Sequence, residues 1–466
     1  MQLQVVQSFA QFNFCFLKDR VLYVILKVKY FIKGIKMSEM SENIKSVITC
    51  DLDGKIETYS DGASKVFGYS KEEAIGKMRV SDFSDGKVVL GHVINWLDEA
   101  VKKGKWEGNT VFINKDRKEV PCKIKITPTK DKNGEHIGYC GVTTPLKDKA
   151  PDEVRPKINL MTKIFAWVVI MRMPFLSATI MPILVGAAVS KFMGFNVDWG
   201  WLGLTLLGGS LLHIGTNTSN DYFDHKSGTD KLNYNYSNKG LNGGSRGIQM
   251  GLISPKGMLN LSIITFALSA VVGIPLIQKA GMPILWLGVI GFLSGLFYTA
   301  PPFRFSSRKG MGELLIGLNF GPLMVAGSAL VQTGQLLPEA FLAGIPLGFL
   351  IAAVVYVNEF PDHDSDKATG KNTLIVVFGP EKARIGYVSL VLGAFLSIVF
   401  LVVNGTFPSL ILISLLASYF GVTSIQTLYK YYNSRLLEPA NWGTIIMHSV
   451  TGILLSVGIW LGSPSL

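Results

Sequence analysis

The sequence predicts an all-α membrane bundle of nine transmembrane helices, preceded by a soluble α+β domain. Three observations carry this prediction. Of the 466 residues, 48% are hydrophobic and only 17% are charged, whereas soluble proteins carry roughly 25% charged residues. Long apolar runs separated by short loops fill the chain beyond residue 160. Short segments that alternate between apolar and polar residues fill residues 41–147 instead.

Composition excludes two other classes of protein. The four cysteines lack tight metal-ligand spacing and none lies beyond Cys140, which excludes a disulfide scaffold and favours reduced, intracellular thiols. The net charge of +12 forms no patch typical of nucleic-acid binding. We therefore expect no nucleic-acid partner.

Residues 1–40 form a basic N-terminal extension. Lysines interrupt the apolar runs of residues 16–36 every few positions, so this segment cannot span a bilayer. Two interpretations stay open. The segment is either a basic helix lying on an anionic membrane surface, or an untranslated upstream stretch, because Met37 and Met40 are both natural starts.

The soluble domain, residues 41–147, is predicted from local patterns. Residues 47–50 and 55–59 alternate about the turn Asp51-Leu-Asp-Gly54, which is typical of a β-hairpin. Helical patches follow, and then three further strands separated by charged turns. The expected helical patches cover 64–75 and 88–101, and the expected strands cover 110–113, 120–127 and 136–142.

This order of two strands, helices and three strands resembles a PAS domain, most clearly in residues 63–76 (ASKVFGYSKEEAIG). The resemblance implies a sensory domain that binds a small ligand or a partner and dimerises. The residues themselves identify no ligand. We expect the domain to regulate whatever follows it in the chain.

Residues 148–160 are interpreted as a charged linker, and residues 161–466 as the membrane domain. Nine runs have the length of roughly 20 residues that a bilayer core requires. The expected spans are 174–193, 200–220, 257–278, 282–300, 311–332, 338–357, 384–403, 406–427 and 443–463.

The positive charges predict the orientation of these spans. Fourteen of the sixteen lysine and arginine residues in loops beyond Met173 fall in the even-numbered loops. Basic residues concentrate in cytoplasmic loops. We therefore expect a multi-pass protein of the cytoplasmic membrane, with the N-terminus, the soluble domain and the even loops in the cytoplasm.

Two acidic clusters end spans on this inner side. In the first, spacings of four and three place Asn217, Asp221 and Asp224 on one helix face. In the second, Asn358, Asp362 and Asp366 repeat every four residues. Pro361 lies inside the second cluster and predicts a break or a fresh helix start there.

The chemistry of the clusters points to a metal-bound diphosphate. One such cluster is explained by ordinary acidic residues at the ends of membrane helices, but two matching ones suit Mg²⁺, which binds hard oxygen ligands and phosphate. The basic residues that a diphosphate needs are expected around the clusters and are Arg304, Lys367 and Lys371, with Arg172 at the start of the first span. With an apolar tail between helices, this is the chemistry of a prenyl diphosphate. A transporter would instead place acids near the middle of its spans.

Over residues 160–466 the chain resembles the UbiA superfamily of intramembrane prenyltransferases. The resemblance rests on both Asp-rich motifs, on residues 298–305 (YTAPPFRF) and on residues 370–379 (GKNTLIVVFG). Residues 243–254 (GGSRGIQMGLIS) are similar to the 1,4-dihydroxy-2-naphthoate prenyltransferases of menaquinone biosynthesis. One position departs from the family pattern, because Gly228 stands where many relatives have a third Asp, and the nearest acid is Asp230.

The resemblance implies Mg²⁺-dependent transfer of a polyprenyl group from an allylic diphosphate to an aromatic acceptor. It implies two Mg²⁺ ions held by Asn217, Asp221, Asp224, Asn358, Asp362 and Asp366. Arg304, Lys367 and Lys371 would bind diphosphate, and acceptor or substrate would be positioned by Arg172, Asn220, Tyr298 and Arg246. Groups supporting the metal ligands would be Asp230, Asp364 and Glu313.

Two alternatives stay open. The acceptor would be 4-hydroxybenzoate or a glycerophosphate lipid instead of the naphthoate. In the second alternative the protein is not an enzyme: the bundle is a non-catalytic anchor and the PAS-like domain acts as a membrane sensor. Intact acidic motifs, and the lack of a signalling module after the PAS-like region, favour the enzyme.

Overall fold

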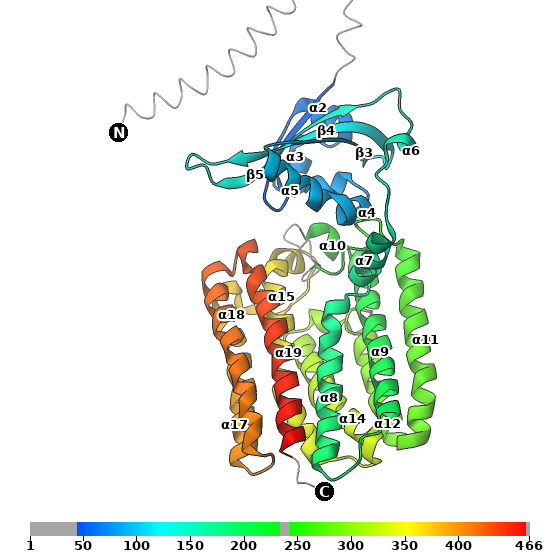
Figure 1. The fold of residues 1–466 in the computed structure, drawn as a ribbon, viewed down its shortest axis with the longest axis vertical. Coiled ribbons are helices and arrows are strands. Elements are labelled where there is room, and N and C mark those ends of the chain that lie inside the picture. The colour runs from blue at the N-terminus through cyan, green and yellow to red at the C-terminus, as the bar shows by residue number, and fades with distance from the viewer. Residues whose placement is uncertain (1–43, 234–242, 463–466) are drawn as a thin grey trace, which may run out of the picture. The chain divides into compact units, whose positions relative to one another are not determined.

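The computed structural model describes residues 44–233 and 243–462 (Figure 1). The predicted N-terminal extension, residues 1–40, lies outside the described residues. The described chain divides into two compact units. The first holds the residues up to Phe83 together with Asn95–Pro156, and the second holds Ser84–Ile94 and Lys157–Leu466.

A five-stranded antiparallel sheet in the order β2-β1-β5-β4-β3 builds the first unit. The prediction of two strands, helices and three strands is confirmed. The strands are β1 (Ser46–Asp51), β2 (Ile56–Tyr59), β3 (Trp106–Ile113), β4 (Glu119–Lys130) and β5 (His136–Pro145). Gly54, with φ of +79°, closes the predicted hairpin between β1 and β2.

Short helices connect β2 to β3. They are α2 (Asp61–Phe67), α3 (Lys71–Ala74), η2 (Val80–Phe83), α4 (Gly86–Val88), η3 (Val89–Val93) and α5 (Ile94–Lys103). The single helical patch expected at 64–75 is two helices, because Gly68 ends α2 in a left-handed conformation and Ser70 begins α3 with a capping box.

The second unit is helical. Its first half contains α7 (Leu160–Ile170), η4 (Met173–Leu176), α8 (Ser177–Phe192), α9 (Trp199–Ser227), α10 (Thr229–Leu232), α11 (Pro255–Ala280) and α12 (Met282–Leu296). A short helix, α6 (Pro151–Val154), precedes it in the first unit.

The second half begins with η5 (Phe305–Ser307), α13 (Met311–Leu318), η6 (Asn319–Leu323), α14 (Met324–Thr333) and α15 (Pro338–Ala368). It continues with α16 (Leu374–Phe378), α17 (Pro380–Val403), η7 (Ser409–Ala417), α18 (Ser418–Tyr431), η8 (Arg435–Leu437) and α19 (Glu438–Leu461). Helix α15 packs against α13, α14, α17 and α19.

The expectation of nine spans is not confirmed. Within the described residues, seven helices are long and apolar enough to cross a membrane, judged by length and composition. The helix α12 has 15 residues, roughly 22 Å at 1.5 Å per residue, and falls short of a bilayer core of about 30 Å. Helix α9 has 29 residues, but glycines, polar residues and the first acidic cluster make it less apolar than the other long helices.

Candidate active site

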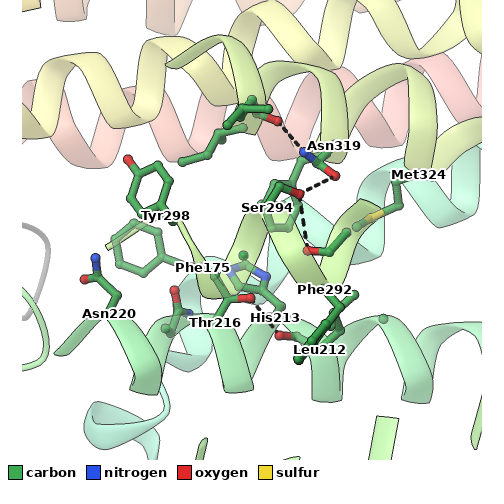
Figure 2. Close-up of a pocket in the computed structure, with 18 of the residues that line it drawn as sticks. Phe175, Leu212, His213, Thr216, Asn220, Phe292, Ser294, Tyr298, Asn319 and Met324 are labelled. Atoms are coloured by element: carbon green, nitrogen blue, oxygen red, sulfur yellow. Dashed lines mark hydrogen bonds between the residues drawn. The ribbon is translucent and has the colours of Figure 1, made fainter. Parts of the chain in front are cut away.

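The helical unit encloses a cavity of about 750 Å³. Residues of α9, α11, α12, α14 and α15 line it, and its lining is polar at one end and apolar along the rest. Figure 2 shows part of this lining, with Asn220 and Tyr298 apart from the apolar Phe292 and Met324. Polar side chains also enter the apolar part, where Ser294 donates a hydrogen bond to Asn319 over 3.2 Å.

The polar end brings the two acidic clusters together. From α9, Asn217, Asn220 and Asp224 line the cavity, and from α15, Asn358, Asp362 and Asp366 do the same. These clusters are separated by more than a hundred residues in sequence. Asp221 is buried behind the lining, where the Ser245 amide donates to both carboxylate oxygens over 3.2 Å.

Lys371 joins the clusters electrostatically. Its ammonium lies 2.8 Å from an Asp224 oxygen and 3.9 Å from an Asp366 oxygen. The loop after α15 carries it, and its amide donates to the Asp366 carbonyl over 2.9 Å. Although burial lowers the pKa of Lys371, the Asp224 and Asp366 carboxylates raise it above its ordinary value. Lys371 therefore stays charged in the lining of the cavity.

Gly228 explains how the chain departs from the family pattern. This glycine ends α9 with φ of +83°, and the short helix α10 then turns Asp230 toward the cavity. Gln249 Nε2 donates to Asp230 Oδ2 over 2.9 Å, and Arg246 donates to the Asp230 carbonyl over 2.5 Å. Burial first, and then the Asp224 and Asp221 carboxylates, raise the pKa of Asp230.

A glycine loop after the first cluster contacts carboxylates of both clusters. The Gly243 amide donates to Asp362 over 3.2 Å, and the Ser245 amide donates to Asp221. Gly244 between them has φ of +73°, and a Cβ there would lie 2.7 Å from an Asp221 oxygen. A side chain at position 244 would displace that carboxylate, so this close approach requires glycine.

Asn233 was missed by sequence reasoning. Its amide donates to Asp362 over 2.7 Å and it lines the cavity. Asn233 lies 129 residues from Asp362 in the chain, and no spacing pattern links the two. The glycine loop had a sequence signal, since it belongs to residues 243–254, but the sequence alone assigned these backbone amides no role.

Pro361 does not break the helix, and the expected interruption of α15 is wrong. The helix runs for 31 residues through both Pro346 and Pro361. A proline at 361 cannot donate to the carbonyl of Val357, four residues earlier. The Asn441 amide donates to that carbonyl over 3.4 Å and to Asn358 over 2.6 Å. A neighbouring helix thus satisfies the freed group, and the second cluster keeps its helical face.

The remaining predicted site residues divide into two groups. Arg172 and Tyr298 line the cavity, and the Arg172 guanidinium lies 4.6 Å from the centre of the Phe175 ring. In the described part of the chain, five others are not in the lining. These are Arg246, which lies against Asp230, Arg304 in the loop before η5, the exposed Lys367 and Asp364, and the buried Glu313.

The acidic side chains do not form a preformed metal cluster. Within residues 44–233 and 243–462, no three His, Cys, Asp or Glu side chains converge to hold an ion. The carboxylates instead form an ion pair with Lys371 and accept hydrogen bonds from Asn233 and from backbone amides. The carboxylates and amides around this cavity still fit Mg²⁺, which binds through one or two carboxylates and completes its shell with water and phosphate oxygens.

Comparison with known proteins assigns both units. Residues 179–445 match the model of the UbiA prenyltransferase family, more than half of the chain. The chain belongs to the UbiA prenyltransferase family. Residues 44–144 match the PAS domain model, so the fused architecture expected from the sequence is confirmed. The protein is a prenyltransferase with an N-terminal PAS domain, and its apolar helices make it an integral membrane protein.

Among curated relatives, the 1,4-dihydroxy-2-naphthoate octaprenyltransferase of Escherichia coli is 32% identical over 235 residues, covering 49% of this chain and 73% of the relative. The enzyme of the same name from Bacillus subtilis is 25% identical over 285 residues, covering 61% and 88%. A solved UbiA homologue from Archaeoglobus fulgidus, bound to DMAPP and Mg²⁺, is 19% identical with a TM-score of 0.45, covering 62% of this chain and 99% of that one.

Proposed function

We propose that this UbiA family member transfers a polyprenyl group from an allylic diphosphate to 1,4-dihydroxy-2-naphthoate, in menaquinone biosynthesis. The observation that carries the proposal is the convergence of two acidic clusters at the polar end of one otherwise apolar cavity. That arrangement suits a charged diphosphate head with a hydrocarbon tail. The names of the Escherichia coli and Bacillus subtilis relatives support the naphthoate as acceptor.

In this proposal, two Mg²⁺ ions would be held by Asn217, Asp224, Asn358, Asp362 and Asp366, with Asp221 behind them. The ions supply charge stabilisation for the diphosphate as it leaves. Lys371 adds a fixed positive charge close to both clusters. Preorganised charge of this kind lowers the barrier because it requires no reorganisation during the reaction.

The proposed reaction breaks one C–O bond and one C–C bond and forms one new C–C bond. The allylic C–O bond breaks and its electron pair leaves with the diphosphate. The ring carbon that bears the carboxylate attacks the allylic carbon and forms the new C–C bond. The ring then loses its carboxylate as CO₂, and the electron pair of that bond restores the aromatic ring. Arg172 is suited to hold this carboxylate beforehand, since its guanidinium lines the cavity near Phe175.

The remaining assignments are also proposals. Asn220 and Tyr298 position the substrates from the cavity lining, and Asp230 and Glu313 support the metal ligands. Arg246 orients Asp230 from outside the lining. Arg304 and Lys367 lie outside the lining and meet the diphosphate only as it enters or leaves. Asp364 also lies outside the lining, and its predicted support of the metal ligands stays a proposal. The cavity opens on the cytoplasmic side of the cytoplasmic membrane, and the PAS domain, bounded at 41–147, dimerises and regulates transfer.

The test uses the full chain in lipid vesicles with Mg²⁺, radiolabelled geranylgeranyl diphosphate and a panel of acceptors. We expect transfer to 1,4-dihydroxy-2-naphthoate, lost with a chelator and in Asp224→Ala and Asp362→Ala. Glu381→Gln is the matched control, because Glu381 is an exposed acid at the start of α17, outside the cavity. Transfer to 4-hydroxybenzoate or a glycerophosphate lipid would refute the naphthoate, and transfer that survives both alanine variants would refute the site.

Regulation by the PAS domain has its own test. Deleting residues 1–150 removes the PAS domain together with Ser84–Ile94 of the second unit, and leaves every residue of the cavity lining in place. We expect the deletion to change the transfer rate or its response to redox conditions. An identical rate across redox conditions and added quinones would refute regulation without touching the enzymatic proposal.

A further inference from the structure

The cavity extends far beyond the acidic clusters. Thr205 and Asp224 both line it and lie on the uninterrupted helix α9, 19 residues apart. At 1.5 Å per residue this distance is roughly 28 Å. Beyond its polar end, apolar side chains such as Leu276, Ile277 and Leu287 dominate the lining. The cavity therefore has the shape and polarity to hold a long hydrocarbon tail.

Two groups of glycines in this part of the bundle contrast in the space beside them. At some, an added Cβ would collide with a neighbour, as at Gly215, where it would lie 2.6 Å from Phe266, and at Gly295, where it would lie 2.3 Å from Thr216. These glycines permit close helix packing. At Gly273 and Gly288, which both line the cavity, a Cβ would meet no atom within 4 Å.

Packing does not explain the second group. Glycine inside a helix is less favourable than alanine, and both positions have room for a larger residue. Gly273 is partly buried and Gly288 is exposed, and both border the cavity, so a side chain at either position would take up space along its wall. The two residues lie on the antiparallel helices α11 and α12, eight residues before and seven residues after the connecting Gly281. They therefore lie at a similar depth, away from the polar end.

We propose that Gly273 and Gly288 set the length of the prenyl tail that the cavity accepts. The inference rests on the proposed prenyl transfer and names the part of the site that selects the donor. Gly288 lies eight residues before the end of α12 at Leu296, roughly 12 Å along the axis, and Tyr298 at the polar end follows. Short tails end before position 288, whereas long tails must pass it.

The experiment measures kcat/KM of the full chain in lipid vesicles with geranyl and octaprenyl diphosphates. The variants are Gly288→Ala, Gly288→Val and Gly288→Leu, with Gly273→Leu. We expect the octaprenyl-to-geranyl ratio to fall stepwise with side-chain volume, by at least about tenfold for Gly288→Leu. The matched control is Gly203→Leu, because Gly203 is an exposed helix glycine with open space that does not line the cavity.

Each outcome decides the proposal. A ratio that is unchanged, or that falls equally in Gly203→Leu, overturns it, as does an equal loss with both donors in a variant whose thermal unfolding is unaltered. If the wild type transfers no prenyl group, the proposed function fails. The selection of tail length is then decided by binding of non-hydrolysable thiolo-diphosphate analogues. Gly288→Leu must weaken binding of the octaprenyl analogue and leave binding of the geranyl analogue unchanged.

Discussion

The interior of the PAS domain is filled with side chains, whereas the interior of the membrane domain contains a large cavity. Aromatic rings fill the PAS core, where Phe67 stacks on Phe83 at 4.4 Å and meets Phe112 edge-on at 5.6 Å. A hollow near Val66 and Val120 measures about 170 Å³, against about 750 Å³ for the membrane cavity. Burial therefore serves stability in the PAS domain, whereas in the membrane domain charged side chains line open space and serve chemistry.

The largest effect is expected at Lys371, which balances the carboxylates in the open cavity. Lys371→Met should lower kcat/KM by at least about 100-fold, because it removes a positive charge from the reacting centre. It should also destabilise the domain by about 3–5 kcal/mol, since the Asp224 carboxylate, which lies 2.8 Å from the ammonium, loses its charged partner. Activity assays and thermal unfolding check both effects.

The control for this prediction is Lys382→Met, which changes an exposed lysine at the start of α17. It should leave both quantities unchanged. Added Mg²⁺ should restore part of the stability that Lys371→Met loses, because the ion replaces the missing positive charge. Equal destabilisation by the two variants would show that the carboxylates of the cavity do not need Lys371.

The filled and open interiors should differ in the cost of losing an aromatic ring. Phe83→Ala should cost about 3–5 kcal/mol in the free energy of unfolding, as expected for a cavity created in a packed core. Phe292→Ala should cost less, because this ring already borders the membrane cavity and contacts Phe266 on one side. Hydrogen exchange on the full chain reports each domain separately. A larger cost at Phe292 would contradict the comparison.

Gly244 tests whether the loop beside the open site is held by its carboxylates. Gly244→Ala imposes a left-handed conformation on alanine, costing about 1–2 kcal/mol, and also crowds Asp221. Gly251→Ala has the same conformational cost without the crowding, since Gly251 has φ of +71° and open space around it. Only Gly244→Ala should weaken the binding of Mg²⁺. Equal Mg²⁺ affinity in both variants would exclude a role for this loop in holding the site.

The sequence predicted those features that repeat locally. Strand alternation located all five strands of the PAS sheet, and spacings of three and four placed Asp224 and Asp362 on helix faces. It did not predict contacts that depend on distant partners. The continuity of α15 at Pro361 depends on Asn441, and Asp362 accepts hydrogen bonds from Asn233 and from the Gly243 amide. Lys367 and Lys371 have equal charge and similar motif context, yet only the second lies in the cavity lining.

The smallest effect concerns the buried thiols of the PAS core. Burial raises the pKa of both Cys50 and Cys122 to about 12. Both thiols are therefore protonated at pH 8, and we expect iodoacetamide to modify the partly exposed Cys140 well before either of them. Peptide mass spectrometry after timed labelling separates the sites.

The sign of the pH dependence follows from the same shift. Between about pH 9 and 12 the unfolded chain loses thiol protons that the folded core retains, so stability contributed by Cys50 and Cys122 falls as pH rises through that window. Near pH 7 both states keep almost all of their thiol protons, and almost no change is expected there. Rapid labelling of Cys50 at pH 8 in the folded protein would mean that the PAS core opens, and the contrast with the membrane cavity would then be one of dynamics as well as packing.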